Sequence, residues 1–408
     1  MAAVALPVGL GALTASPAQA VSPAQVGWIS AELASSYGLP EATIVVDATA
    51  TSGDLSIGWD FSYDAVSVTF AEVAGHSGPG FGTVPDGCAA VTAGIVCALD
   101  AVVASMGSAN DGVYQSGVCM TALVADLGEG ANRFVASSDC PDQQFVVTSG
   151  SGRDDLELMG IAAAGTYVDS GGGDDFVVGS SSLDEIHGGD GSDEILGLSG
   201  DDKILGDGGS DTIYGGPGAD KQDGGPGDDV LSSETSGYWG GGKIDTGADD
   251  VRGGSGKDTV NLSLDVNGAT VSLDDRANDA VGGDGGDNYH SDIERVLGSG
   301  GDDRLVGSSH AEELSGNYGD DRISGGGGND KLYGGADSDK IDGGPGKDSV
   351  YGDSSSCCTN NGNDVITVAD GKRDSVNCGG GADAVLADKV DIVAQDGLQQ
   401  CERVRRKR

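Results

Sequence analysis

The sequence has few of the residues from which globular cores and catalytic centres are usually built. Aromatic residues make up 5% of its 408 residues, and it contains only 4 histidines. Lysine and arginine number 22 against 66 aspartates and glutamates, which gives a net charge of −44 at pH 7. So few large apolar side chains predict a thin core. The uncompensated negative charge opposes compaction and excludes nucleic acid as a partner.

Neither a membrane span nor a catalytic signature is found. After residue 20, no apolar run approaches the ~20 residues that a transmembrane helix needs. The motifs H-E-x-x-H, G-x-S-x-G and G-x-x-x-x-G-K-[ST] are absent. The histidines are scattered, at His76, His187, His290 and His310. We expect no enzyme, no catalytic residue and no organic cofactor. One enzyme alternative stays open, a polysaccharide-acting β-helix that uses paired carboxylates.

The first twenty residues have the composition of an export signal. They read MAAVALPVGLGALTASPAQA and end in an A-x-A cleavage pattern at Ala18-Gln19-Ala20, although no lysine or arginine precedes the apolar run. We interpret residues 1–20 as a signal peptide. The protein is then expected to be secreted and extracellular, either free or associated with the cell wall.

The 8 cysteines are even in number, which in an exported chain favours disulfides. Spacing suggests three pairs, Cys88–Cys97, Cys119–Cys140 and Cys378–Cys401. Cys357 and Cys358 are adjacent, so they form either a strained vicinal pair or bridges to other cysteines. A zinc site is the weaker alternative, because no C-x-x-C pair is present.

Residues 21–120 differ from the rest of the chain. Short apolar or alternating runs such as 42–46 and 65–70, separated by glycine and proline, predict strands. We interpret 21–120 as a small N-terminal β domain, or as irregular coils that cap the longer C-terminal part of the chain. A cap is expected because an exposed first coil would be an open sheet edge. Trp28 and Trp59 are assigned to its core rather than to a ligand platform.

Glycine is what the sequence has in abundance, with 74 residues, and much of it recurs with a period of nine. Gly188 to Ser232 reads GGDGSDEIL, GLSGDDKIL, GDGGSDTIY, GGPGADKQD and GGPGDDVLS. Glycine falls at positions one, two and four, aspartate at six and usually an aliphatic residue at eight. Glycines permit positive φ and tight turns, and in a very short strand only position eight faces inward. Turns of bare carbonyls and carboxylates form oxygen cages of the kind that calcium prefers.

The period continues outside this stretch, in two blocks. An irregular form of the repeat begins at 127–135, and the repeat is regular from Ser170. After a gap at 262–297, which is four nonads long, the repeat resumes. We interpret 233–243 as a surface loop with Trp239 folded onto the body, and 262–297 as an irregular insertion. Within it, Gly282 to His290 (GGDGGDNYH) matches the motif out of register, and we interpret it as a loop rather than a site.

The repeat resembles the calcium-binding nonapeptide of the RTX (repeats-in-toxin) family, over residues 149–386. The resemblance implies an all-β fold, a parallel β-roll with two nonads per coil over residues 121–408. It also implies Ca²⁺ between turns stacked two nonads apart, held by position-six aspartates and backbone carbonyls. The ligand candidates carried over are Asp175, Gly188, Gly189, Gly191, Asp193, Asp202, Gly206, Asp211, Gly215, Gly218, Asp220, Gly224, Gly227, Asp229, Asp249, Gly253, Gly256, Asp258, Asp303, Asp321, Gly325, Gly328, Asp330, Asp339, Gly343, Gly346, Asp348, Asp364 and Asp383.

Several departures from the pattern weaken individual nonads. The nonad 179–187 lacks its glycines, Gln222 replaces the apolar residue at position eight, and Glu312 replaces one aspartate. One aliphatic side chain per nine residues is too little to offset backbone ordering alone, so cation binding should drive folding. We therefore expect a secreted calcium-binding structural module. The alternatives are a cell-surface adhesin that binds wall or extracellular polysaccharide, the β-helix enzyme, or a disordered acidic chain.

Overall fold

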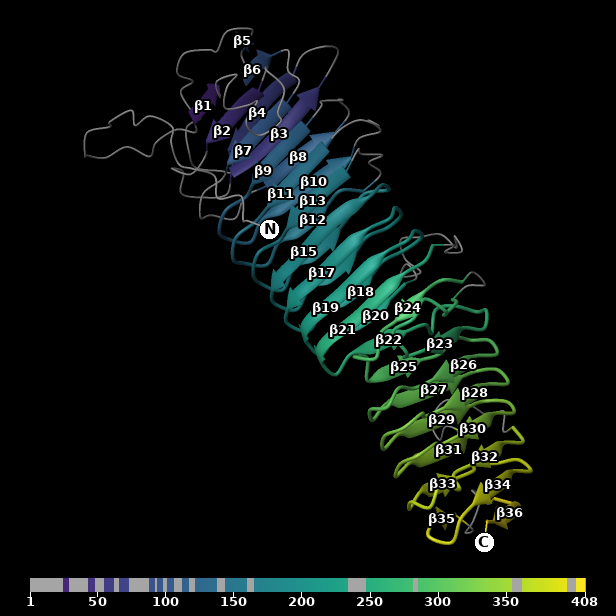
Figure 1. Ribbon diagram of the computed structural model, residues 1–408. Coiled ribbons are helices and arrows are strands. Elements are labelled where there is room, and N and C mark those ends of the chain that lie inside the picture. The colour runs from purple at the N-terminus through teal and green to yellow at the C-terminus, as the bar shows by residue number, and fades with distance from the viewer. Residues whose placement is uncertain are drawn as a thin grey trace.

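The chain forms an elongated parallel β-solenoid of about 13 turns, without a helix among its described residues (Figure 1). This computed structural model describes residues 122–137, 144–159, 165–233, 247–281, 285–353, 362–394 and 401–407, together with the backbone of eight N-terminal strands. The all-β fold of stacked coils predicted from the nonads is confirmed. None of the described residues belongs to a helix with the length and apolarity to span a bilayer.

Three parallel sheets run along the stack. Sheet A contains β9 (Ala122–Asp126), β11 (Gln144–Thr148), β13 (Gly165–Asp169), β15 (Asp184–Asp190), β17 (Lys203–Gly208), β19 (Lys221–Gly227), β21 (Asp250–Gly256) and β24 (Asn288–Tyr289). Sheet B contains β10 (Arg133–Ser137), β12 (Asp155–Glu157), β14 (Phe176–Val178), β16 (Glu194–Leu196), β18 (Thr212–Tyr214), β20 (Val230–Ser232), β22 (Thr259–Asn261), β25 (Arg295–Leu297), β27 (Glu313–Asn317), β29 (Lys331–Gly335), β31 (Ser349–Asp353), β33 (Ser375–Asn377) and β35 (Ile392–Val393). Sheet C contains β23 (Thr270–Ser272), β26 (Arg304–Val306), β28 (Arg322–Ser324), β30 (Lys340–Asp342), β32 (Val365–Thr367), β34 (Ala384–Ala387) and β36 (Arg403–Arg406).

The register repeats once per pair of nonads. Ile186 pairs with Ile204 in sheet A, and Ile195 pairs with Ile213 in sheet B. Each coil therefore uses one nonad for each of two facing strands. Position eight of every nonad lies directly over the same position in the next coil.

The N-terminal strands join these sheets. They are β1 (Gln25–Trp28), β2 (Thr43–Asp47), β3 (Leu55–Phe61), β4 (Val66–Glu72), β5 (Cys88–Val91), β6 (Gly94–Cys97), β7 (Ala101–Ser105) and β8 (Gly112–Ser116). β2, β7 and β9 are parallel neighbours, as are β8 and β10, whereas β3 pairs with β4 and β5 with β6 in antiparallel fashion. The division at 120/121 stays a prediction. Residues 1–20 and the side chains of Trp28 and Trp59 lie outside the described residues.

The core consists mainly of position-eight side chains, stacked in one column on each of the facing sheets. Ile186, Ile195 and Ile204 are completely buried, and buried side chains continue through both blocks of the repeat. Gln222 occupies its predicted core position and is also buried, with Nε2 donating to the carbonyl of Ser232 at 3.1 Å. The polar side chain is therefore accommodated by a hydrogen bond rather than expelled from the stack.

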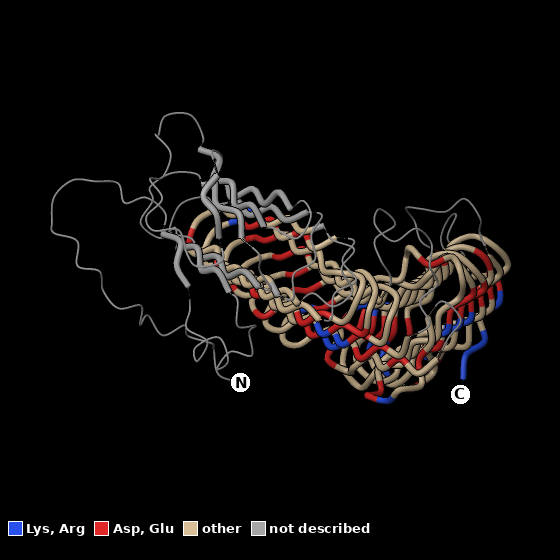
Figure 2. Tube along the Cα trace, turned by 90° about the horizontal axis from the view of Figure 1, so that it is seen from above, with Lys and Arg blue, Asp and Glu red and all other residues tan. Residues whose placement is uncertain are grey.

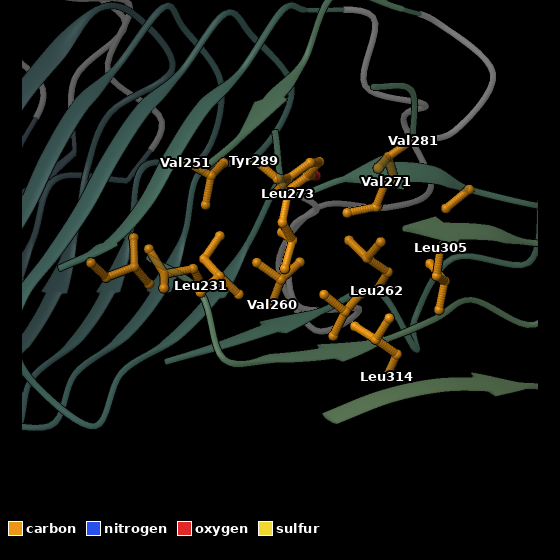
Figure 3. Packing of buried hydrophobic residues seen from close by; sticks show 14 of the residues in the cluster. Leu231, Val251, Val260, Leu262, Val271, Leu273, Val281, Tyr289, Leu305 and Leu314 are labelled. Carbon is orange, nitrogen blue, oxygen red and sulfur yellow. The ribbon is translucent and has the colours of Figure 1, made fainter. Parts of the chain in front are cut away.

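The gap at 262–297 is where the solenoid changes sheets. β23 begins sheet C and β24 ends sheet A, while sheet B runs on without interruption through β22 and β25. Figure 3 shows the core side chains passing through this junction, from Leu231 and Val251 past Tyr289 to Leu305 and Leu314. The interpretation of 282–290 as a loop is wrong at Asn288–Tyr289, which forms β24 with Tyr289 completely buried, whereas residues 282–284 lie outside the described residues.

One predicted disulfide is present at the C-terminal end. Cys378 and Cys401 are bonded, with an Sγ–Sγ distance of 1.99 Å. For the second pair, the backbone of β5 and β6 sets Cys88 opposite Cys97, but their side chains lie outside the described residues. Cys119, Cys140, Cys357 and Cys358 lie outside them too, as does the loop residue Trp239.

Candidate metal sites

Position-six carboxylates form continuous ladders beside each sheet. The backbone N–H of each donates to Oδ1 of the carboxylate one coil further on, as from Asp193 to Asp211 at 2.9 Å and from Asp202 to Asp220 at 2.8 Å. Beside sheet C, Asp321 donates to Asp339 at 2.9 Å. Figure 2 shows the acidic residues recurring coil after coil along the stack. One oxygen of every such carboxylate is thus fixed by the backbone.

In most of these carboxylates the second oxygen is buried and has no hydrogen-bond partner among the residues that the structure describes. This holds for Oδ2 of Asp154, Asp175, Asp193, Asp202, Asp211, Asp229, Asp258, Asp321, Asp330, Asp339, Asp348, Asp364, Asp374 and Asp383. Buried polar atoms are almost always satisfied in folded proteins. A regular row of unsatisfied carboxylate oxygens therefore points to a bound partner that is positively charged.

Two carboxylates differ because serine replaces glycine at position two. Ser180 donates to Asp184 from its backbone N at 2.6 Å and from Oγ at 2.8 Å. Ser299 does the same for Asp303, at 2.7 Å and 2.6 Å. Both oxygens of these aspartates are satisfied within their own turn. We therefore drop Asp303 from the ligand candidates. The nonad 179–187, which lacks its glycines, also needs no cation at Asp184, because Ser180 satisfies both carboxylate oxygens.

Position-one glycines leave room for this unsatisfied oxygen. A Cβ atom on Gly188 would stand 2.6 Å from Oδ2 of Asp193 and 2.8 Å from the carbonyl oxygen of Gly206. On Gly325 the distances would be 2.5 Å to Oδ2 of Asp330 and 2.6 Å to the carbonyl of Gly343. A carboxylate oxygen and a backbone carbonyl thus converge on a space that any side chain would fill. Cδ1 of Ile195 lies 3.1 Å from the same point at Gly188, so the donors there are the two oxygens, which are of the type that calcium prefers.

Glycines at positions two and four take left-handed backbone conformations. Gly189 and Gly191 have φ values of 97° and 148°. A non-glycine residue adopts this conformation at some coils, as Leu198 does with φ of 80°. The predicted glycines therefore shape the turn by conformation, whether or not their carbonyls bind a cation.

Burial raises the pKa of the ladder carboxylates. The pKa rises to about 8 for Asp202 and Asp321 and to about 9 for Asp339, first because burial disfavours the charged form and then because neighbouring carboxylates repel it. Backbone hydrogen bonds oppose the rise without cancelling it. Without a cation, these groups take up protons near neutral pH.

Side chains alone do not complete a metal site. Among the described residues, no three histidine, cysteine, aspartate or glutamate side chains are close enough together to hold an ion. Each coil contributes one carboxylate per turn, so the remaining ligands must be backbone carbonyls. The donor set fits Ca²⁺, which accepts many oxygens in variable geometry, better than a metal that requires nitrogen or sulfur.

The ladders include carboxylates outside the predicted ligand set. Asp154 lies in a nonad that lacks only the position-one glycine and Asp374 in one that lacks all three glycines, yet both have the same unsatisfied oxygen among the described residues. Asp287 accepts the backbone N–H of Asp249 at 3.1 Å and so ends the ladder beside sheet A. Glu312 keeps its place beside sheet B, donating its backbone N–H to Asp330 at 3.0 Å, and its carboxylate also accepts a bond from Ser308.

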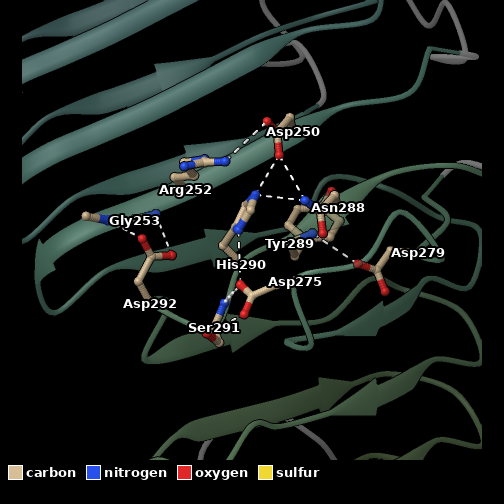
Figure 4. A network of polar contacts seen from close by, with 11 residues as sticks. Asp250, Arg252, Gly253, Asp275, Asp279, Asn288, Tyr289, His290, Ser291 and Asp292 are labelled. Carbon is tan, nitrogen blue, oxygen red and sulfur yellow. Dashed lines mark hydrogen bonds and ion pairs between the residues drawn. The ribbon is translucent and has the colours of Figure 1, made fainter.

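A separate polar network holds the junction together (Figure 4). His290 Nε2 lies 2.6 Å from Oδ1 of Asp250, and Nδ1 lies 3.0 Å from Oδ1 of Asp275. Burial acts to raise the pKa of Asp250, but hydrogen bonds from His290 and Asn288 outweigh it and the pKa is lowered. Because Asp275 follows β23 and Asp250 begins β21, His290 joins the end of sheet A to the start of sheet C.

Comparison with known proteins supports the repeat. The family model described as RTX calcium-binding nonapeptide repeat (4 copies) matches residues 169–204, 196–231, 245–265, 291–317 and 315–350. No curated protein matches the chain. Repeats of this family bind calcium, are generally structural rather than enzymatic, and typically occur in secreted extracellular proteins. Residues 169–350, with their stacked carboxylate ladders, belong to the RTX calcium-binding nonapeptide repeat family.

Proposed function

We propose that the chain is a secreted calcium-binding structural protein whose roll folds when Ca²⁺ occupies its turns. The observation that carries this is the row of buried Oδ2 atoms without hydrogen-bond partners, opposite position-one glycines. Bound Ca²⁺ supplies the positive charge and ligand contacts that these oxygens lack. The cation ligands are the position-six aspartates named above, apart from Asp303, together with carbonyls of the glycine turns.

Coupling of folding to calcium follows from the charge on the ladders. In the absence of a cation the carboxylates must bind protons or repel one another across adjacent coils. Sites in extracellular modules typically bind calcium with Kd of about 10⁻⁴–10⁻³ M. The export signal predicted at 1–20 is consistent with this proposal. The low calcium of a cytosol would leave such sites unfilled, so the roll would fold after export.

A calcium titration followed by circular dichroism tests the proposal. The chain in excess chelator should have little β structure and should gain it cooperatively as calcium is added. Magnesium is the matched control, because it has the same charge but keeps its water and requires a tighter octahedral site. A β-rich spectrum that is the same in chelator and in calcium would overturn the proposal.

A further inference from the structure

Sheet C has an outer face unlike those of sheets A and B. Parallel pairing aligns its outward residues in two columns. The first column is Arg304, Arg322, Lys340, Val365, Ala384 and Arg403. The second is Val306, Ser324, Asp342, Thr367, Leu386 and Arg405. Five of these twelve side chains are cationic and one is acidic, in a chain whose net charge is −44. Figure 2 shows basic residues at the C-terminal end of the stack.

These cations lack ion-pair partners among the described residues. Arg304, Arg322 and Lys340 are exposed and stand directly beside one another in successive strands, without a carboxylate between them. Sheet B shows the alternative arrangement. There Glu313 separates two cations, 3.5 Å from Arg295 and 3.6 Å from Lys331. In sheet A, Lys203 pairs with Glu185 at 2.7 Å.

Like charges on directly opposite strand positions destabilise a sheet. Sheet A also has two neighbouring cations, Lys203 and Lys221, but Glu185 and Asp250 stand on either side of them. The longer row on sheet C has no such acidic neighbours in its column, so it calls for an external counter-charge. Neighbouring strands lie ~4.7–4.9 Å apart, so the row presents one cation per coil at this spacing. Five strand steps from Arg304 to Arg403 then span about 24 Å.

Two exposed apolar side chains lie on the same face. Val365 is 48% exposed and Leu386 is 36% exposed, and they occupy strands between Lys340 and Arg403. Along the stack, the face therefore presents three cations, then two strands with an exposed apolar residue (the apolar step), then cations again on β36. Sugar rings carry apolar C–H faces, so a chain of acidic sugars matches both the charge and the apolar step.

We propose that the outer face of sheet C binds a linear acidic polysaccharide with a carboxylate on each sugar unit. Each carboxylate would pair with one cation of the first column, and a sugar ring would pack against Val365 and Leu386. A nucleic acid fits less well, because duplex DNA carries about one charge per 1.7 Å of axis, denser than one cation per coil can match, and the acidic remainder of the chain repels the excess. This surface rests on the calcium-loaded roll of the proposed function, which serves as its scaffold.

The test measures binding of a fluorescent galacturonic-acid octamer in calcium buffer, using chain whose circular dichroism shows the folded roll. The triple variant Arg304→Gln/Arg322→Gln/Lys340→Gln removes the row and keeps the exposed strands. Three exposed ion contacts predict a loss of about tenfold or more in affinity. Lys221→Gln is the control, since Lys221 lies at the same repeat position on sheet A.

The outcomes separate the surface from its scaffold. Binding by the native chain that falls in the triple variant but not in Lys221→Gln supports the proposal. Lack of binding by the folded native chain overturns it, as does equal binding by the triple variant. Equal competition by a single-stranded oligonucleotide also overturns it, because the face would then be a general polyanion site. Failure of the chain to fold in calcium would instead refute the proposed function.

Discussion

Asp202→Asn should change stability in opposite directions with and without calcium. Asp202 is buried in the ladder beside sheet A, where its Oδ1 accepts the backbone N–H of Asp184 at 2.8 Å. Asparagine keeps an acceptor for that bond and removes the charge. The substitution therefore isolates the electrostatic role of the carboxylate from its role in the backbone ladder.

The size of the stability change without calcium follows from the pKa of Asp202. Burial, followed by the charges of Asp184 and Asp220, raises the pKa of Asp202 from 3.8 to about 8. At pH 7 the folded, cation-free chain must hold a proton there, at a cost of at most about 4 kcal/mol relative to the unfolded chain. Asn does not carry this cost. The variant in chelator should be more stable than the native chain by up to that amount.

In calcium the variant should be less stable than the native chain, because it lacks one of the ligands that bind the cation. A site with Kd of about 10⁻⁴–10⁻³ M contributes about 1.4–2.7 kcal/mol at about 10 mM calcium. Losing one such site should lower the free energy of unfolding by this amount, and losing two by twice as much. Urea unfolding in calcium, followed by circular dichroism, measures this loss. In chelator at pH 7, where the native chain has little β structure, the opposite effect is measured as a higher β content of the variant.

Asp201→Asn is the matched control, since Asp201 is the exposed neighbour and its Oδ1 accepts the N–H of Ala219 at 3.1 Å. It should shift stability by less than about 0.5 kcal/mol in either buffer. If Asp202→Asn lowers the β content in chelator as well as the stability in calcium, the carboxylate acts only as a hydrogen-bond acceptor, and the cation argument fails.

Three further outcomes are expected. In chelator, β structure measured by circular dichroism should be greatest in acid and should fall as pH rises from about 4 to about 9. The reason is that folding raises the pKa values of Asp321 and Asp339 to about 8 and about 9. An increase of β structure with pH would contradict this prediction. Gly188→Ala should weaken calcium-induced folding in a titration, because its Cβ would stand 2.6 Å from Oδ2 of Asp193, whereas Gly208→Ala, whose nearest contact would be 3.5 Å, should not. Reducing Cys378–Cys401, which closes a separation of 23 residues, should remove about 3 kcal/mol of local stability and speed hydrogen exchange in β36; unchanged exchange there would show that pairing with β34 suffices.

The fold could be predicted because the nine-residue period fixes several features at once. Glycine positions specify the turns and the aliphatic position specifies the inward face. The family resemblance added two nonads per coil, which sets Ile186 and Ile204 in adjacent coils, as the structure has them. The Cys378–Cys401 pair was also accessible, since both cysteines lie near the last coil. These features depend on local spacing, which a sequence displays directly.

The junction could not be predicted, because it depends on which sheet a strand joins. Asp287 lies 38 residues after Asp249, although most ladder partners are 18 apart. The match at 282–290 looked out of register because register was counted along the chain. In the structure the chain first builds β23 of sheet C and then returns to sheet A, and Tyr289 fills the core position that the return requires.

The residue at position two decides which carboxylates need a cation. Where this residue is serine and position six is aspartate, as at Ser180 and Ser299, its N–H and hydroxyl satisfy both oxygens of the aspartate. At Ser308 the hydroxyl bonds the longer Glu312, whose Oε2 keeps no partner among the described residues. Where position two is glycine, as at Gly189, the carboxylate keeps an unsatisfied buried oxygen. A serine hydroxyl thus substitutes locally for a metal ion, since either partner offsets part of the cost of burying the carboxylate oxygens. The number of cations bound per chain should therefore follow the residue at position two more closely than the count of position-six aspartates.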